Sequence, residues 1–317
     1  MIVVVSHPRD AHAMRVLDRL SERGEQAFLF DVADFPDRAT LTLDFAEPAK
    51  PVAWVDHATS GNVRVGDATA VWWRRPQLPQ LGAVTDDAAR GFVHGEWHEA
   101  VHGLYRLLDC PWMNAPDRND AGSRKPLQLQ VASRLGLRVP QTLMTSDSAE
   151  ARRFADRLGL GNVVYKIFSA THQVWRETRR LTEGDLPMLD SLRLAPVIFQ
   201  ELVPAVADLR VTIVGDDVFA MAIDSRGTSY DVDFRVGLAQ ARTSAVLLPG
   251  DVETALRALM VELGLAYGAI DLRLTPEGEY VFLEINPAGE FLFSEHGSGH
   301  PITDAVAGWL AAPPAPA

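Results

Sequence analysis

Short apolar runs alternate with amphipathic stretches along the first third of the chain. Residues 2–5, 27–30 and 70–73 are apolar runs of strand length. Between the first two, apolar residues recur at the spacing of a helix, and a longer helical pattern covers 92–108. Because strands and helices in alternation are typical of a parallel sheet covered by helices, this part is predicted to be an α/β unit.

The second half of the chain has more closely spaced apolar runs. Strands are predicted at 163–168, 197–201, 209–214, 218–223, 269–274 and 280–285. The residues Gly215-Asp216-Asp217 indicate a tight hairpin, and the spacing favours antiparallel pairing. Helices are predicted over 256–263 and after Ser123, which could cap the second of them with Pro126 near its start. The turn-rich stretch 110–122 indicates a domain boundary.

Composition and charge narrow the function classes. The formal net charge of −12 disfavours a non-specific grip on nucleic-acid phosphates. No apolar run approaches the roughly 20 residues of a membrane helix, and the N-terminus lacks the features of a secretion signal. The single cysteine, Cys110, suits a reducing cytoplasm, and without a basic activator beside it we interpret it as a buried structural thiol.

Oxygen-bearing side chains gather on the last predicted hairpin. Glu284 and Asn286 are two positions apart on one strand, so they face the same side, and Asp271 can join them from the neighbouring strand. Two carboxylates and an amide oxygen suit magnesium, which leaves coordination positions for nucleotide phosphates. The alternative is that Asp271 and Glu284 are ordinary solvent-facing residues of a two-sided hairpin.

Two isolated lysines precede this hairpin in the sequence. Lys125 stands at the entrance to a predicted helix, and Lys166 lies within an apolar strand. A lysine inside a central strand needs an anionic partner, and a nucleotide phosphate would serve, although either lysine alone is also compatible with a surface position. The chain has no G-x-G-x-x-G after its first strand and no G-x-x-x-x-G-K-[ST], which argues against dinucleotide-binding and P-loop proteins.

The order of these residues resembles the ATP-grasp superfamily, in the branch that includes ribosomal-protein glutamate ligases and the maturases of microviridin-like graspetides. The resemblance covers nearly the whole chain and rests on Lys125, Lys166, 200–203, 208–211, 233–235, Asp271 and 284–287, in that order. Closer similarity to graspetide maturases comes from the runs 72–76, 125–129 and 282–290.

The resemblance implies an ATP-grasp fold of the α/β (α+β) class in three parts. We expect an N-terminal parallel-sheet pre-ATP-grasp domain at 1–115, a small central domain at 116–195 and a C-terminal antiparallel-sheet domain at 196–310. The Pro/Ala-rich residues 311–317 are expected to form a disordered tail. Nucleotide would lie between the central and C-terminal parts.

The resemblance also implies a role for each matching residue. Lys125 and Lys166 would hold ATP phosphates, backbone groups of Glu201, Leu202 and Val203 would pair with adenine, and Asp208 would face the ribose. Arg210 and Arg235 would lie near the γ-phosphate and the incoming carboxylate, while Asp271, Glu284 and Asn286 would hold Mg²⁺, as two ions for which Mn²⁺ can substitute. The chain departs from its relatives at 169–171, where they often have a glycine-rich loop, and at 247–248.

The implied reaction is an ATP-dependent ligation. A carboxylate is a poor electrophile, and attack on the γ-phosphate converts it into an acyl phosphate with a good leaving group, provided that cations neutralise the charges that meet. The resemblance implies that Asp or Glu side chains of a ribosomally made precursor peptide, with leader and core, are joined to Ser/Thr hydroxyls or Lys amines as macrocyclic esters or amides. The resemblance also implies a homodimer, and the lone thiol of Cys110 favours a cytoplasmic location. A glutamate or amino-acid ligase and a nucleotide-binding regulator without turnover remain alternatives.

A rival motif lies in the predicted helix 92–108. His98-Glu99-Ala100-Val101-His102 matches H-E-x-x-H, in which two histidines one turn apart bind zinc and the glutamate activates water. No convincing third ligand follows in the sequence. A zinc hydrolase is therefore a further alternative, and a polar helix flank is the simpler interpretation.

Overall fold

The N-terminal part is a parallel sheet with helices on its faces. In the computed structural model, which describes residues 1–82, 84–168, 177–224 and 232–314, this sheet has the order β2-β1-β6-β7. Its strands are β1 (Ile2–Val5), β2 (Ala27–Phe30), β6 (Ala70–Trp73) and β7 (Trp112–Met113). Helix α1 (Ala11–Glu22) begins at Asp10, whose side chain accepts a hydrogen bond from the backbone N–H of His12. The predicted α/β unit is confirmed.

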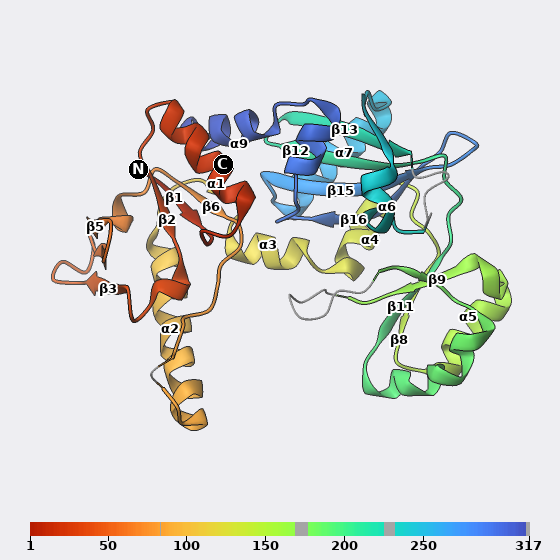
Figure 1. Cartoon of the computed structure of the whole chain (residues 1–317), viewed down its shortest axis with the longest axis horizontal. Coiled ribbons are helices and arrows are strands. Elements are labelled where there is room, and N and C mark those ends of the chain that lie inside the picture. Colours follow the sequence, from red (N-terminus) through yellow and green to blue (C-terminus); the bar gives the residue numbers. More distant parts are fainter. Residues whose placement is uncertain (83, 169–176, 225–231, 315–317) are drawn as a thin grey trace.

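The structure adds a second sheet and a longer helix to this part. Strands β3 (Ala39–Asp44), β4 (Val52–His57) and β5 (Gly61–Val63) form an antiparallel sheet that the sequence analysis did not predict. Helix α2 (Asp87–Leu107) begins five residues before the predicted start, because Asp86 caps it by accepting from Ala89 N. Figure 1 shows α2 extending well away from the parallel sheet.

The central part is an antiparallel sheet of four strands in the order β10-β9-β11-β8. The strands are β8 (Thr142–Thr145), β9 (Val163–Lys166), β10 (Arg179–Arg180) and β11 (Val197–Glu201). Helix α5 (Ser148–Leu158), the 3-10 segment η3 (Leu160–Asn162) and the irregular 3-10 segment η4 (Glu183–Leu194) pack around it. Strand β9 ends at Lys166, which contacts Glu284 of the C-terminal part.

The C-terminal part is a five-stranded antiparallel sheet in the order β14-β13-β12-β15-β16. Its strands are β12 (Ala207–Val214), β13 (Asp217–Asp224), β14 (Arg242–Val246), β15 (Tyr267–Leu274) and β16 (Tyr280–Asn286). Helices α4 (Lys125–Arg134) and α7 (Gly250–Leu263) bury their apolar residues on it. As predicted, β12 and β13 are joined by a tight turn, in which Gly215 takes a φ of 56°.

The N-terminal and C-terminal sheets share one apolar core. Side chains of β1 and β6 pack with residues of β12, β15 and the C-terminal helix α9 (Ile302–Ala311). Arg19 of α1 and Arg23, which follows α1 as its C-cap, both pair with Asp304 of α9, so the first and last helices are held together by charge as well as by packing. Figure 1 shows α1 and α9 side by side at one end, with the central sheet at the other.

Two elements pack with a different part of the molecule from the one expected from the domain bounds 116–195 and 196–310. Strand β11, which begins after residue 196, is hydrogen-bonded between β9 and β8 of the central sheet. Helix α4 packs against β16 and α7 of the C-terminal part, and the short helix α3 (Pro116–Gly122) packs with it. The remaining short elements are η1 (Val32–Asp34), η2 (Val65–Asp67), α6 (Phe234–Gly237), η5 (Leu238–Gln240) and α8 (Leu292–Ser298).

The predicted cap at Ser123 is wrong, and part of the predicted tail lies outside the residues that the structure describes. Ser123 does not cap α4, because only two residues separate α3 from α4 and the second of them, Arg124, is the N-cap of α4. Ser123 is instead the C-cap of α3, and its hydroxyl donates to the Asn119 carbonyl at 2.7 Å. Of the predicted tail, Ala311 is the last residue of α9, and 315–317 lie outside the described residues. In the described chain, no helix combines the length and apolar character that crossing a membrane requires.

Candidate active site

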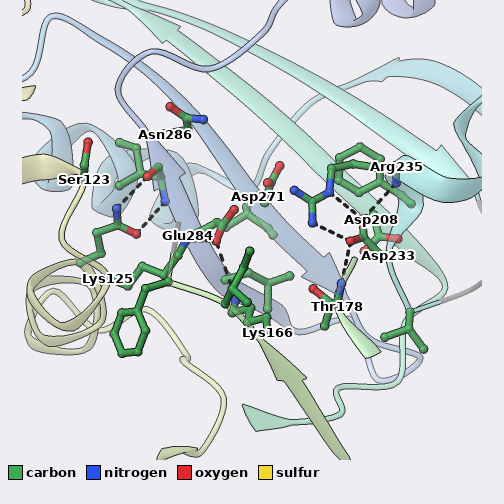
Figure 2. A pocket seen from close by; sticks show the side chains of 18 of the residues that line it. Ser123, Lys125, Lys166, Thr178, Asp208, Asp233, Arg235, Asp271, Glu284 and Asn286 are labelled. Carbon is green, nitrogen blue, oxygen red and sulfur yellow. Dashed lines mark hydrogen bonds and ion pairs between the residues drawn. The ribbon is translucent and has the colours of Figure 1, made fainter. Parts of the chain in front are cut away.

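A cavity of about 410 Å³ lies where α4, the end of β9 and the C-terminal sheet meet. Most of the predicted site residues line it, namely Lys125, Lys166, Asp208, Arg235, Asp271, Glu284 and Asn286. Figure 2 shows Lys125, Lys166, Asp271 and Glu284 close together, with Arg235 and Asp208 on the other side of the cavity. Residues that are far apart in the sequence are thus brought to one place.

Glu284 is the contact point of both lysines. Its Oε2 accepts a short hydrogen bond from Lys125 Nζ and lies 3.8 Å from Lys166 Nζ. Burial alone would raise the pKa of Glu284, but the two ammonium groups outweigh it and hold this pKa well below its usual range. Burial lowers the pKa of Lys166, and the neighbouring Lys125 adds to that lowering.

Asp271 lies directly opposite Glu284 on the neighbouring strand. Its Oδ1 accepts from Arg210 Nη1 at 2.8 Å, so Arg210 supports the carboxylate although it does not line the cavity itself. Burial raises the pKa of Asp271, and the negative charge of Glu284 acts in the same direction. A register shift follows Asp271, which turns the next residues relative to β16.

Asn286 is exposed at the end of β16 and lines the same cavity. Its Oδ1 accepts from the backbone N–H of Ala288 at 3.0 Å. The amide group is therefore fixed in orientation by the chain that follows it. An amide oxygen has a second lone pair, so this hydrogen bond leaves it able to accept a further partner.

Arg235 faces the lysines from the opposite wall. It forms a bidentate pair with Asp233, with Nε and Nη2 at 2.7 and 2.5 Å from the two carboxylate oxygens. Burial opposes its charge, but the pair with Asp233 dominates and raises the pKa of Arg235. The Asp233 carboxylate also accepts from the backbone N–H groups of Arg235 at 3.2 Å and Thr178 at 3.0 Å.

Asp208 and the predicted adenine-binding segment are joined by an arginine that the sequence analysis missed. Arg273 Nε donates to Asp208 Oδ1 at 2.9 Å, and Arg273 Nη1 donates to the carbonyl of Val203 at 2.8 Å. The N–H groups of Glu201 and Leu202 donate to Gln141 and Asn162 of the central part. None of the residues 201–203 lines the cavity, so pairing of this segment with adenine remains a prediction.

A buried glutamine, Gln128, also escaped the sequence analysis as a site residue. Its side chain lies in α4 and bridges the backbone N–H and C=O of Ile285 at 3.2 and 2.8 Å. These two hydrogen bonds hold β16 at the residue between Glu284 and Asn286. The sequence offered one indication that Gln128 belongs to the site. It lies three residues after Lys125, so the two side chains are on the same side of a helix.

The H-E-x-x-H motif lies in α2 and is exposed. The rings of His98 and His102 stack at a centroid distance of 4.2 Å, and the Glu99 side chain is 84% exposed. Within 1–82, 84–168, 177–224 and 232–314, no group of three or more His, Cys, Asp or Glu residues could hold a metal. The described residues therefore offer no zinc site at this motif.

Cys110, predicted to be a buried structural thiol, is less buried than expected. It is half-buried, and burial raises the pKa of its thiol to about 11. The thiol is therefore protonated at neutral pH. The predicted departure from the relatives at 169–171 lies outside the described residues.

The three-part architecture and the cavity between its central and C-terminal sheets define an ATP-grasp fold. Residues 1–120 match the family model described as MvdD pre-ATP grasp domain. Among solved structures, the macrocyclase MdnC of Microcystis aeruginosa MRC, bound with precursor peptide MdnA, is 30% identical with a TM-score of 0.86, and the match covers 98% of each chain. This chain belongs to that family of ATP-grasp ligases, and it is an enzyme.

Two other relatives extend the comparison. The ATP-grasp ligase PsnB, complexed with minimal precursor, Mg and ADP, is 26% identical with a TM-score of 0.80, over 98% of this chain and 96% of that one. A probable alpha-L-glutamate ligase of Cellvibrio japonicus (strain Ueda107) is 27% identical over 248 residues, which are 76% of this chain and 80% of the relative. The predicted superfamily and fold are confirmed.

Proposed function

We propose that this enzyme activates Asp or Glu side-chain carboxylates of a ribosomally made precursor peptide as acyl phosphates and joins them to Ser/Thr hydroxyls or Lys amines. The products would be macrocyclic esters or amides. The observation that carries the proposal is the contact of one carboxylate, Glu284, with both lysines, beside Asp271 in a single cavity. The precursor peptides in the MdnC and PsnB complexes support the choice of substrate.

The cavity suits an anionic nucleotide that arrives with a divalent cation. The described lining includes three cationic side chains (Lys125, Lys166 and Arg235) and four carboxylates (Asp208, Asp233, Asp271 and Glu284). An anion alone would compete with these carboxylates, and a cation alone would face the lysines. Mg²⁺ bound with ATP satisfies both sets of charges, and the ligand set of Asp271, Glu284 and Asn286 is the oxygen-only type that it prefers.

The lysines would exchange partners when nucleotide binds. Without nucleotide, Lys125 and Lys166 neutralise Glu284. In the proposed complex they turn to the phosphates, and Glu284 becomes available with Asp271 and Asn286 to hold Mg²⁺. Bound Mg²⁺ would supply charge neutralisation between the phosphate groups. Asp208 is proposed to face the ribose, and the backbone at 201–203 to pair with adenine.

The two arginines would act on the reacting carboxylate. Arg235 lies on the cavity wall, and its guanidinium is held in one orientation by Asp233. Arg210 is oriented by Asp271 and lies behind it. Fixed guanidinium groups stabilise the negative charge that develops when the carboxylate attacks the γ-phosphate, and again when the nucleophile displaces phosphate.

Mass spectrometry of a candidate precursor peptide incubated with enzyme, ATP and Mg²⁺ tests the proposal. Each new ester or amide link removes one water, and alkaline hydrolysis opens esters while it leaves amides intact. Dehydrated peptide that appears only with ATP supports the proposal. Stoichiometric ATP consumption with addition of glutamate instead of loss of water would favour the second candidate, a glutamate ligase, which the Cellvibrio relative suggests.

The proposed enzyme is a cytoplasmic homodimer whose peptide partner binds through both leader and core. Light scattering of the purified protein at micromolar concentration measures the assembly state. A mass of twice the 34.7 kDa chain supports the dimer, and a monomer mass contradicts it.

A further inference from the structure

The segment that follows the candidate metal ligand Asn286 is held by side chains at every carbonyl. Asn114 Nδ2 donates to the carbonyl of Pro287 at 3.0 Å. Arg74 Nη1 donates to the carbonyls of Ala288 and Gly289, the second at 2.9 Å. Tyr267 OH also donates to Gly289 at 2.9 Å, and Arg210 Nη2 donates to Glu290 at 3.0 Å. We call residues 287–290 the clamped loop.

The donors come from two different parts of the molecule. Arg74 directly follows β6 and Asn114 directly follows β7, so both come from the N-terminal part. Tyr267 and Arg210 lie in β15 and β12 of the C-terminal sheet. None of Arg74, Asn114 and Tyr267 lines the cavity, and the clamped loop connects them to Asn286, which does.

Arg74 is itself fixed within the N-terminal part. Its side chain is fully buried, and its Nε donates to Asp10 Oδ2 at 3.2 Å, while Asp10 accepts from the Ser6 hydroxyl at 2.9 Å. A buried arginine costs free energy unless it is paired and hydrogen-bonded. Its two partners are a carboxylate of its own part and the carbonyls of the clamped loop. Arg74 therefore ties the loop to the parallel sheet.

The clamped loop is also packed so that it has one position. A Cβ on Gly289 would lie 2.3 Å from Ala269 Cβ and 3.2 Å from the carbonyl of Asn286. The loop begins with the hydrogen bond from Ala288 N to Asn286 Oδ1, and Arg74 holds the carbonyl of the same Ala288. The side-chain orientation of Asn286 thus depends on a residue of the N-terminal sheet.

We propose that Arg74, Asn114 and Tyr267 are positioning residues that fix Asn286 at the metal site through the clamped loop. The inference rests on the proposed function, because it assigns Asn286 to the metal. It also gives the N-terminal part a task in the reaction although that part contributes no side chain to the described cavity lining. Partners behind metal ligands orient them, and their loss costs about 10–100-fold in metal affinity or activity.

Two matched pairs of variants test the inference. The quantity measured is the affinity for Mn²⁺ in the presence of ADP, determined by electron paramagnetic resonance. Tyr267→Phe removes only the hydroxyl that reaches the loop, and Tyr105→Phe removes a buried hydroxyl that has no partner among the described residues. Arg74→Lys removes the double contact to the carbonyls, and Arg38→Lys alters an exposed arginine of the same N-terminal part that pairs with Asp34.

We expect Arg74→Lys to weaken Mn²⁺ binding by about 10–100-fold and Tyr267→Phe by several-fold, while both controls stay within about twofold of wild type. In the peptide assay, kcat should fall by similar factors with an unchanged KM for the peptide. Melting temperatures establish that each variant is folded at the assay temperature. If Arg74→Lys does not fold, Tyr267→Phe decides alone.

Wild-type Mn²⁺ affinity in folded Tyr267→Phe and Arg74→Lys would overturn the inference. A purely structural effect would lower the melting temperature and leave the binding constant of the folded protein unchanged, which also contradicts it. If the wild-type protein binds Mn²⁺ with ADP but modifies no peptide, the proposed function fails. The Mn²⁺ affinities of the variants relative to wild type then still test the positioning role, so failure of the proposed function and failure of the inference can be told apart.

Discussion

Glu284→Gln is the substitution whose consequences the structure defines most sharply. Glutamine keeps the shape of the side chain and removes its charge, which faces Lys125 in a hydrogen bond and Lys166 at 3.8 Å. The Glu284 side chain is 23% exposed, so both interactions are only partly screened. The two ammonium groups would then face each other without their shared counter-ion.

The structure gives the magnitude of this change. Two unit charges about 4 Å apart attract by about 4 kcal/mol at an effective dielectric constant of about 20. Because the site is open to water and the carboxylate regains hydration on unfolding, we expect the free energy of unfolding to fall by only about 1–3 kcal/mol. The loss in the reaction should be larger, about 4 kcal/mol in the barrier or about a thousandfold in rate, since a metal ligand is lost.

The assay separates the two effects. Product formation is followed by mass spectrometry with saturating ATP and Mg²⁺, and nucleotide binding without metal is followed by calorimetry. In Glu284→Gln the lysines no longer have a carboxylate to leave, so metal-free ADP should bind at least as tightly as to wild type. Glu279→Gln, at an exposed surface pair with Arg138 just before the same strand, is the matched control and should retain wild-type activity. Wild-type turnover in Glu284→Gln would refute the assignment.

Three further predictions concern other parts of the molecule. Burial lowers the pKa of His12 from 6.5 to about 4. Between these pH values the unfolded state therefore binds more protons than the folded state. As the pH drops from 6.5 to 4, the free energy of unfolding should fall by up to about 3 kcal/mol. Denaturant titrations with wild type and His12→Gln measure this, and an equal pH dependence in both would contradict it. Gly289→Ala should lower the free energy of unfolding by about 1–3 kcal/mol through overpacking, as measured by calorimetric unfolding. The control Gly91→Ala, at an open position of α2, should be neutral or stabilising. Equal melting temperatures of the two variants would exclude the clash at Gly289. His98→Ala should leave peptide modification and its metal dependence unchanged in the mass-spectrometric assay, and loss of activity would revive the zinc interpretation.

The sequence predicted those features that depend on local pattern. Alternation along 280–285 placed Glu284 and Asn286 on one side of a strand, and an apolar context singled out Lys166. Strands at 39–44 and 52–57 were missed, because several of their residues are half-exposed and their alternation is weak next to the fully buried β1. The start of α2 at Asp87 could have been predicted from Asp86, a residue type that commonly caps helices, but the apolar pattern does not extend to it.

Partners distant in the sequence were beyond prediction from pattern. Nothing local to Arg273 indicates that it will pair with Asp208, 65 positions away, and nothing local to Arg74 indicates the carbonyl of Gly289. Such contacts depend on how whole sheets pack against each other. They also explain why α4, which enters the site with Lys125, belongs to the C-terminal core although the sequence placed it with the central part.

In the proposed reaction the peptide carboxylate passes through an acyl phosphate, and an oxygen label follows that step directly. A precursor peptide with oxygen-18 in its Asp and Glu side chains is incubated with enzyme, ATP and Mg²⁺, and the released phosphate is examined by mass spectrometry. Attack on the γ-phosphate carries one carboxylate oxygen into the phosphate group, and the nucleophile then displaces it. We predict one labelled oxygen in phosphate for each link formed, and unlabelled phosphate accompanying new links would contradict the account.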